Sequence, residues 1–97
     1  MRFMIVEHFA PGQLHEVYRI VRERDRMLPD GLTYIDSWIT ASLDLCFQIM
    51  ECDDPLLLQE WAARWGDLAN VEIHPIVTSR ETAALFARLA AEDTTDE

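Results

Sequence analysis

Hydrophobic and polar positions follow two different periods along this chain. In four stretches, apolar residues either alternate with polar ones or form short runs rich in β-branched and aromatic residues. Each stretch ends at residues that are typical of turns. Such stretches predict β-strands. They cover residues 2–9, 32–41, 44–52 and 69–78.

Three other stretches carry the spacing and end signals of helices. Between residues 13 and 27 the apolar positions recur every three or four residues, which indicates an amphipathic helix. Asp54 followed by Pro55 is a typical helix start, and Gly66 predicts the end of that helix. Thr78 and Glu81 have the spacing of a capping box and predict a last helix that runs to about Ala91.

The order of these elements predicts the fold class. Strand, helix, strand, strand, helix, strand is the βαββαβ pattern of ferredoxin-like α+β domains, in which helices cover one face of a four-stranded antiparallel sheet. The chain order of the strands then becomes 4-1-3-2 across the sheet. Pro75 favours an edge position for the last strand, because proline cannot donate to a strand ladder. We expect a single domain over residues 1–91, including the last helix, and an acidic, frayed tail at 92–97.

Composition narrows the function classes. The chain has 97 residues, enough for one core, and 49% of them are hydrophobic. No apolar run is long enough to span a membrane, and the N-terminal one is too short for a signal peptide, so we expect a cytoplasmic protein. The formal net charge of −10 argues against binding to nucleic acid or to a membrane surface. The arginines of residues 19–26 alternate with acidic residues and predict an exposed face with ion pairs.

Strand alternation divides the predicted sheet into two faces. The face expected to lie under the helices is almost purely apolar and comprises Phe3, Ile5, Phe9, Ile35, Ile39, Leu45, Phe47, Ile49, Val71, Ile73 and Val77. The opposite, open face mixes apolar, aromatic and ionisable groups and comprises Met4, Val6, His8, Tyr34, Asp36, Trp38, Cys46, Gln48, Met50, Glu72, His74 and Ile76. An uncovered face with so many apolar groups predicts a homodimer that closes two such faces together.

Five segments of the sequence resemble a known family. They are RMLPDGL (26–32), YIDSWI (34–39), CFQIME (46–51), DDPLLLQEWAARW (53–65) and EIHPIVTS (72–79). Together they are similar to a small bacterial family, domain of unknown function 3303, in the dimeric α/β-barrel group of ferredoxin-like proteins. The Asp36-Ser37-Trp38 and Trp61-x-x-Arg64-Trp65 patterns make the resemblance specific, and it covers Phe3 to about Leu89. It implies a dimer and supplies no activity.

The polar groups of the open face suggest a site for a small organic ligand. With the first and third predicted strands taken as parallel, we expect His8, Tyr34 and Asp36 near one end of the sheet, with Glu72 close to His8. His8 would act as a general base, oriented by Asp36 or Glu72. Tyr34 or Gln48 would stabilise negative charge. The ligand-binding set is Tyr34, Trp38, Gln48, Met50 and His74. The alternatives are a non-catalytic dimer, in which these groups only fix the register of the interface, and a regulatory module for another enzyme.

Metal and thiol chemistry are less favoured. His8, His74 and Glu72 offer metal-ligand types, but their spacing is not that of a metal motif, so neither a metal nor another cofactor is predicted. Cys46 and Cys52 lie in one predicted strand, roughly 20 Å apart, which excludes a disulfide and indicates reduced packing cysteines. Trp61 and Trp65 fall on one helix stripe and are expected in the core.

Overall fold

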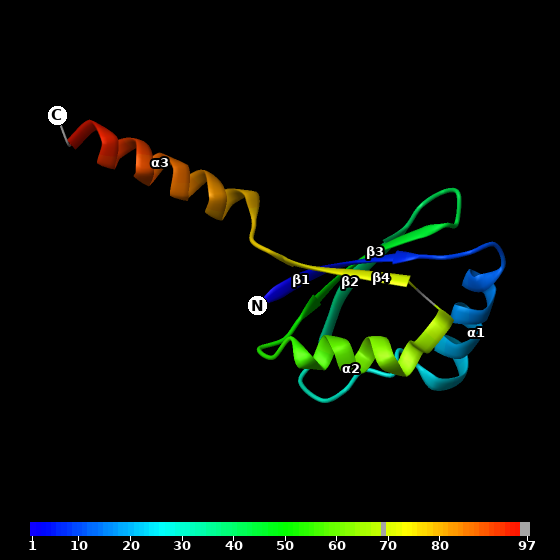
Figure 1. Ribbon diagram of the computed structural model, residues 1–97. Coiled ribbons are helices and arrows are strands. Elements are labelled where there is room, and N and C mark those ends of the chain that lie inside the picture. Colours follow the sequence, from blue (N-terminus) through cyan, green and yellow to red (C-terminus); the bar gives the residue numbers. More distant parts are fainter. Residues whose placement is uncertain (69, 96–97) are drawn as a thin grey trace.

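The computed structural model describes residues 1–68 and 70–95 and has the predicted element order (Figure 1). The elements are β1 (Arg2–His8), α1 (Gln13–Arg24), β2 (Thr33–Ile39), β3 (Leu45–Glu51), α2 (Leu56–Trp65), the short 3₁₀ helix η1 (Gly66–Leu68), β4 (Asn70–Ile76) and α3 (Ser79–Thr95). This is a ferredoxin-like α+β fold with an added C-terminal helix, as predicted. The helix expected to stop near Ala91 continues to Thr95. Ala69, assigned to the last strand, and the last two residues of the expected tail lie outside the described residues.

The four strands form one antiparallel sheet in the order β2-β3-β1-β4. This is the predicted order, and it places Pro75 on the edge strand β4. The two central strands, β1 and β3, are antiparallel, with Phe3 opposite Met50 and His8 opposite Leu45. The expectation that these two strands run parallel is therefore wrong.

Local sequence signals set the helix ends. The Asp54 carboxylate accepts the amide of Leu56 at 3.0 Å, so Asp54 caps α2. At α3 the Glu81 amide donates to the Thr78 hydroxyl at 3.1 Å, and the Thr78 amide donates to the Glu81 carboxylate at 3.2 Å. This reciprocal pair is the predicted capping box.

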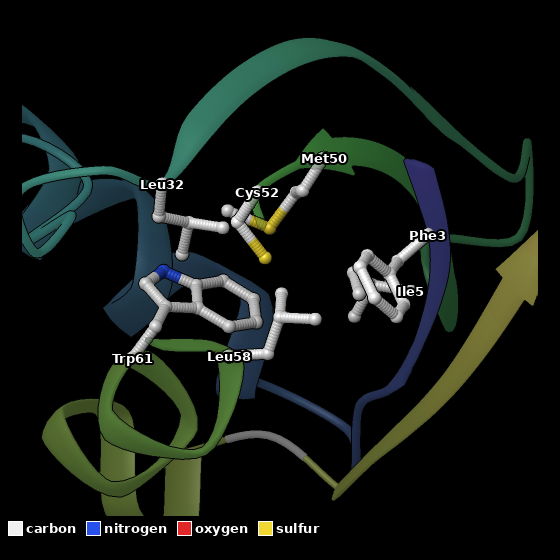
Figure 2. Packing of buried hydrophobic residues seen from close by; sticks show 7 residues of the cluster. All are labelled: Phe3, Ile5, Leu32, Met50, Cys52, Leu58 and Trp61. Carbon is white, nitrogen blue, oxygen red and sulfur yellow. The ribbon is translucent and has the colours of Figure 1, made fainter. Parts of the chain in front are cut away.

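The hydrophobic core lies between α2 and one half of the sheet. Seven buried residues form it: Phe3, Ile5, Leu32, Met50, Cys52, Leu58 and Trp61. Figure 2 shows the sulfur atoms of Met50 and Cys52 pointing from the sheet toward Leu58 and Trp61 of α2. By contrast, α1 has no fully buried residue, although it lies on the same side of the sheet as α2 (Figure 1). The half of the sheet under α1 is therefore less tightly packed.

The pleat of β3 is opposite to the predicted one. Cys46, Gln48 and Met50 are buried on the helix side, while Phe47 is exposed on the open face. The two sets of alternating β3 residues are both rich in apolar groups, so hydrophobicity alone could not show which set faces the helices. The pairing with β1 decides this, because Gln48 lies opposite Ile5 and paired residues share a face, here the helix-covered one.

A β-bulge in β2 explains a second difference. The register shifts between Tyr34 and Asp36, so Tyr34 pairs with buried Met50 and Asp36 pairs with Ile49 on the open face. Alternation had assigned Tyr34 and Asp36 to one face and Ile35 to the other. The bulge puts Tyr34 on the helix side and leaves Ile35 exposed.

After its first turn α3 projects away from the sheet and the other helices (Figure 1). The radius of gyration is 17.7 Å, against about 13 Å for a compact chain of this length. The helix carries exposed apolar side chains at Leu85, Phe86 and Leu89. Within the described residues, no helix is both long and apolar enough to cross a membrane.

Candidate functional site

A cavity of about 70 Å³ lies between α1 and the sheet. Its polar wall comes from Glu7 of β1, Arg26 after α1, Ser37 of β2, and Cys46 and Gln48 of β3. The rest of the wall is apolar or aromatic and comprises Phe9, Leu14, Val17, Tyr18, Val21, Ile39, Trp61, Ala62, Trp65 and Val71. A few convergent polar groups in an apolar enclosure are typical of small-molecule sites.

Glu7 is the acidic group of this cavity. Its position in β1 is in phase with Phe3, Ile5 and Phe9, so the pleat turns its carboxyl under the helices, and only 7% of the residue is exposed. Burial raises the pKa of Glu7 to about 7, against the smaller opposing effects of a hydrogen bond from Cys46 and the charge of Arg26. A carboxyl with this pKa can both take up and release a proton at neutral pH.

Cys46 faces Glu7 across the β1–β3 ladder. Burial and the neighbouring Glu7 raise the pKa of the Cys46 thiol to about 12, so the thiol stays protonated. A protonated thiol is a poor nucleophile. Cys46 and Cys52 are both buried and free, which agrees with the expectation that they are reduced packing residues.

Arg26 is held at the cavity by an unusual turn. Asp25 and Met27, on either side of it, have φ angles of 60° and 57°, a conformation that is costly for residues with a side chain. The indole N–H groups of Trp61 and Trp65 both donate to the Arg26 carbonyl at 3.2 Å. Thus the two tryptophans expected only to fill the core also fix this turn.

The side chain of Arg26 is placed by Tyr34. Its guanidinium lies 3.6 Å from the centre of the Tyr34 ring, in cation–π geometry. The Tyr34 hydroxyl in turn is hydrogen-bonded to the Ser37 hydroxyl. The predicted ion pairs of the arginine cluster do form at Arg19, which contacts Glu16 and Glu23. Arg26 differs from that exposed cluster because it lines the cavity.

On the open face the structure brings together three of the predicted site residues. The Glu72 carboxylate is 3.0 Å from Nε2 of His8 and 3.1 Å from Nε2 of His74. Hydrogen bonds from His74 and His8 lower the pKa of Glu72. All three side chains are well exposed. The predicted proximity of His8 and Glu72 is therefore confirmed, and their catalytic roles stay predictions.

The other predicted site residues do not join this group. Tyr34, Gln48 and Met50 lie on the helix-covered face, so they cannot line a pocket with His8. Asp36 is on the open face but on edge strand β2, in the row of Ile49 and toward the other end of the sheet. The expected set of His8, Tyr34 and Asp36 at one end is thus wrong.

Trp38 lies on the open face, as predicted, and 53% of it is exposed. Its neighbour across the ladder is Phe47, which is 37% exposed. The two rings belong to an apolar surface, not to the enclosed cavity. Over residues 1–68 and 70–95, no three His, Cys, Asp or Glu side chains are grouped to hold a metal ion.

Glu7 and Arg26 were not predicted as site residues. Glu7 had a detectable signal, since a carboxylate in phase with three apolar residues of a strand must be buried in the folded protein. Arg26 had none, because its position depends on a turn with two left-handed residues and on donors from α2, far along the chain.

Comparisons with known proteins give a family and a fold. Residues 1–90 match the family described as "Domain of unknown function (DUF3303)". No curated protein matches the chain. A similar solved structure is SCO4226 from Streptomyces coelicolor A3(2), with 19% sequence identity and a TM-score of 0.53 over 81% of this chain and 99% of that one. At this identity the likeness supports the ferredoxin-like fold alone.

Proposed function

The chain belongs to the DUF3303 family, and we propose that it binds a small organic molecule in the cavity between α1 and the sheet, where Glu7 exchanges a proton with it. The observation that carries this proposal is the buried Glu7 carboxyl in an apolar cavity. Ionisable groups with perturbed pKa values in cavities cluster at functional sites. The site moves from the open face, where the sequence placed it, to the covered face.

The position of the cavity suits a ligand that enters by displacing α1. This helix has no fully buried residue, so its outward movement exposes little tightly packed surface. The cavity of about 70 Å³ is smaller than the ~150 Å³ engineered cavity that takes up benzene. The ligand is therefore small, or its binding widens the gap under α1.

Native mass spectrometry tests this proposal. Freshly purified protein, alone and after incubation with a library of small acids, phenols and neutral analogues, is expected to carry added mass that is lost on denaturation. The matched control is Ala62→Leu, which extends a branched side chain into the cavity and should abolish the added mass. Clean spectra of the wild-type protein with the whole library, or equal loading of the Ala62→Leu variant, would contradict the proposal.

We also propose that the chain is a homodimer closed through the open sheet face. Trp38 and Phe47 are neighbours across the ladder and leave large apolar areas exposed on this face, and contiguous apolar surface marks interaction sites. A two-fold pairing of identical faces would cover it. Sedimentation equilibrium of the wild-type chain tests this: a mass near twice 11.3 kDa is expected, and a monomer at micromolar concentration would contradict it.

A further inference from the structure

The polar wall of the cavity contains a cation, Arg26, that forms no ion pair within the described residues. Arg2, Arg19, Arg64 and Arg88 each form an ion pair with a glutamate. Within the described residues no carboxylate forms an ion pair with Arg22, Arg24, Arg26 or Arg80, and of these four only Arg26 is half-buried, where it lines the cavity. The guanidinium stacks on the Tyr34 ring and acts on Glu7 through its charge, but within the described residues its N–H groups donate no hydrogen bond. These N–H groups are therefore available to an anion from outside the chain.

Three side chains of α2 hold the turn that carries Arg26. Trp61 and Trp65 donate to the Arg26 carbonyl, and Arg64 donates to the Met27 carbonyl at 3.0 Å. The Trp61-x-x-Arg64-Trp65 pattern thus fixes the two adjacent carbonyls of a turn in which Asp25 and Met27 have positive φ. A strained backbone conformation persists only where surrounding contacts hold it in place, and such conformations cluster at ligand-binding sites.

We propose that the cavity selects a small organic carboxylate, whose charged end binds the guanidinium of Arg26 and whose apolar end packs between α1 and α2. This inference rests on the proposed function and adds the ligand class. The guanidinium matches a carboxylate with two parallel hydrogen bonds. The Ser37 hydroxyl and the Gln48 amide are further cavity groups that can donate, and Leu14 and Val17 offer apolar contact. Glu7 in its protonated form can donate to the same carboxylate.

The tryptophans provide the readout for a test. Trp61 and Trp65 line the cavity, whereas Trp38 lies on the opposite face of the sheet and is an internal control. Protein labelled with ¹⁵N at tryptophan is titrated with butyrate and, separately, with the neutral isostere butyramide. We expect butyrate to shift the indole signals of Trp61 and Trp65, to leave that of Trp38 unchanged, and to bind at least about tenfold more tightly than butyramide.

Variants distinguish the effect of the Arg26 charge on butyrate binding from the effect of the net charge of the protein. Arg26→Gln is expected to weaken butyrate binding by about tenfold and to leave butyramide unaffected. Arg24→Gln makes the same charge change at an exposed neighbour and should bind butyrate as the wild type does. Arg26→Lys keeps the charge without the planar fork, and we expect an intermediate affinity, which provides a second comparison where the glutamine variant does not fold.

The outcomes distinguish this inference from the proposed function. Equal affinities for butyrate and butyramide, or butyrate binding by Arg26→Gln at the wild-type affinity, would overturn the carboxylate and leave a neutral-ligand cavity standing. If neither probe shifts Trp61 or Trp65, the carboxylate proposal fails. The proposed function then depends on the mass-spectrometric screen of the wider library.

Discussion

A single carboxyl sets the chemistry of the covered face. Glu7 occupies a position of β1 whose neighbours on the same face are apolar. Its partner across the ladder in β3 is Cys46, which is not a cation. Its burial is costly at neutral pH, because a charged carboxylate is poorly solvated there. Because of this cost, the free energy of unfolding depends on pH, and this dependence can be measured without knowing the ligand.

Glu7→Gln should stabilise the protein at high pH. The pKa of Glu7 is raised from 4.5 to about 7 in the folded state, so between these values the folded protein holds a proton that the unfolded chain has released. The free energy of unfolding therefore falls as pH rises through this range, by up to about 3 kcal/mol in all. Glutamine mimics the protonated form. In urea unfolding we expect equal stabilities near pH 4 and a gain of about 2–3 kcal/mol for the variant near pH 8.5.

Glu72→Gln is the control with the opposite sign. Its pKa is lowered by the hydrogen bonds from His74 and His8, so its contribution to stability is present at neutral pH and is lost as pH falls. The glutamine variant should therefore be no more stable than the wild type at either pH. A Glu7→Gln variant that gains nothing at high pH would show that Glu7 is solvated in the folded protein.

At the scale of elements, signals carried by neighbouring residues predicted more than signals that depend on pairing. The capping box at Thr78 and the cap at Asp54 were predicted because each uses residues within one turn. The pleat of β3 was not, because both of its faces are apolar and the ladder with β1 decides between them. The bulge after Tyr34 was missed for the same reason, and with it the separation of Tyr34 from Asp36.

The candidate site shows the same division. His8 and Glu72 were predicted to meet because β1 and β4 are antiparallel neighbours in the expected strand order. The cavity depends on how closely α1 packs against the sheet, and no residue pattern within α1 reports that distance. Its stripe of Leu14, Val17 and Val21 predicted a packed helix, yet none of these residues is fully buried.

Loose packing predicts that α1 opens more readily than α2. Local opening costs least where few apolar groups are buried, and α2 contributes Leu58 and Trp61 to the core while α1 contributes no fully buried residue. In hydrogen–deuterium exchange, amides of residues 13–24 should exchange at least about tenfold faster than those of residues 56–65. Bound butyrate should slow exchange in α1 selectively. Equal protection of the two helices would contradict an entry route under α1.

At the scale of the whole molecule, two apolar surfaces are not covered by any other part of residues 1–68 and 70–95. One is the open sheet face with Trp38 and Phe47, and the other is the stripe of α3, where Phe86 is 65% exposed. An isolated helix of 17 residues is only marginally stable in water, and α3 extends away from the rest of the chain after its first turn (Figure 1). The proposed homodimer would cover both surfaces, with the sheet faces opposed and each α3 packed on the partner subunit.

This arrangement predicts that arginine on either surface weakens the dimer. Phe47→Arg buries an unpaired charge between the opposed sheets, and Phe86→Arg does so under α3, so each should raise the dissociation constant by about a hundredfold or more in sedimentation velocity. The matched control is Leu56→Arg, the same kind of change at an exposed apolar residue of α2, on the far side of the sheet from the proposed interface. It should dimerise as the wild type does. If Phe47→Arg weakens the dimer and Phe86→Arg does not, the sheets alone form the interface. If neither does, the open face has another partner and the homodimer is wrong.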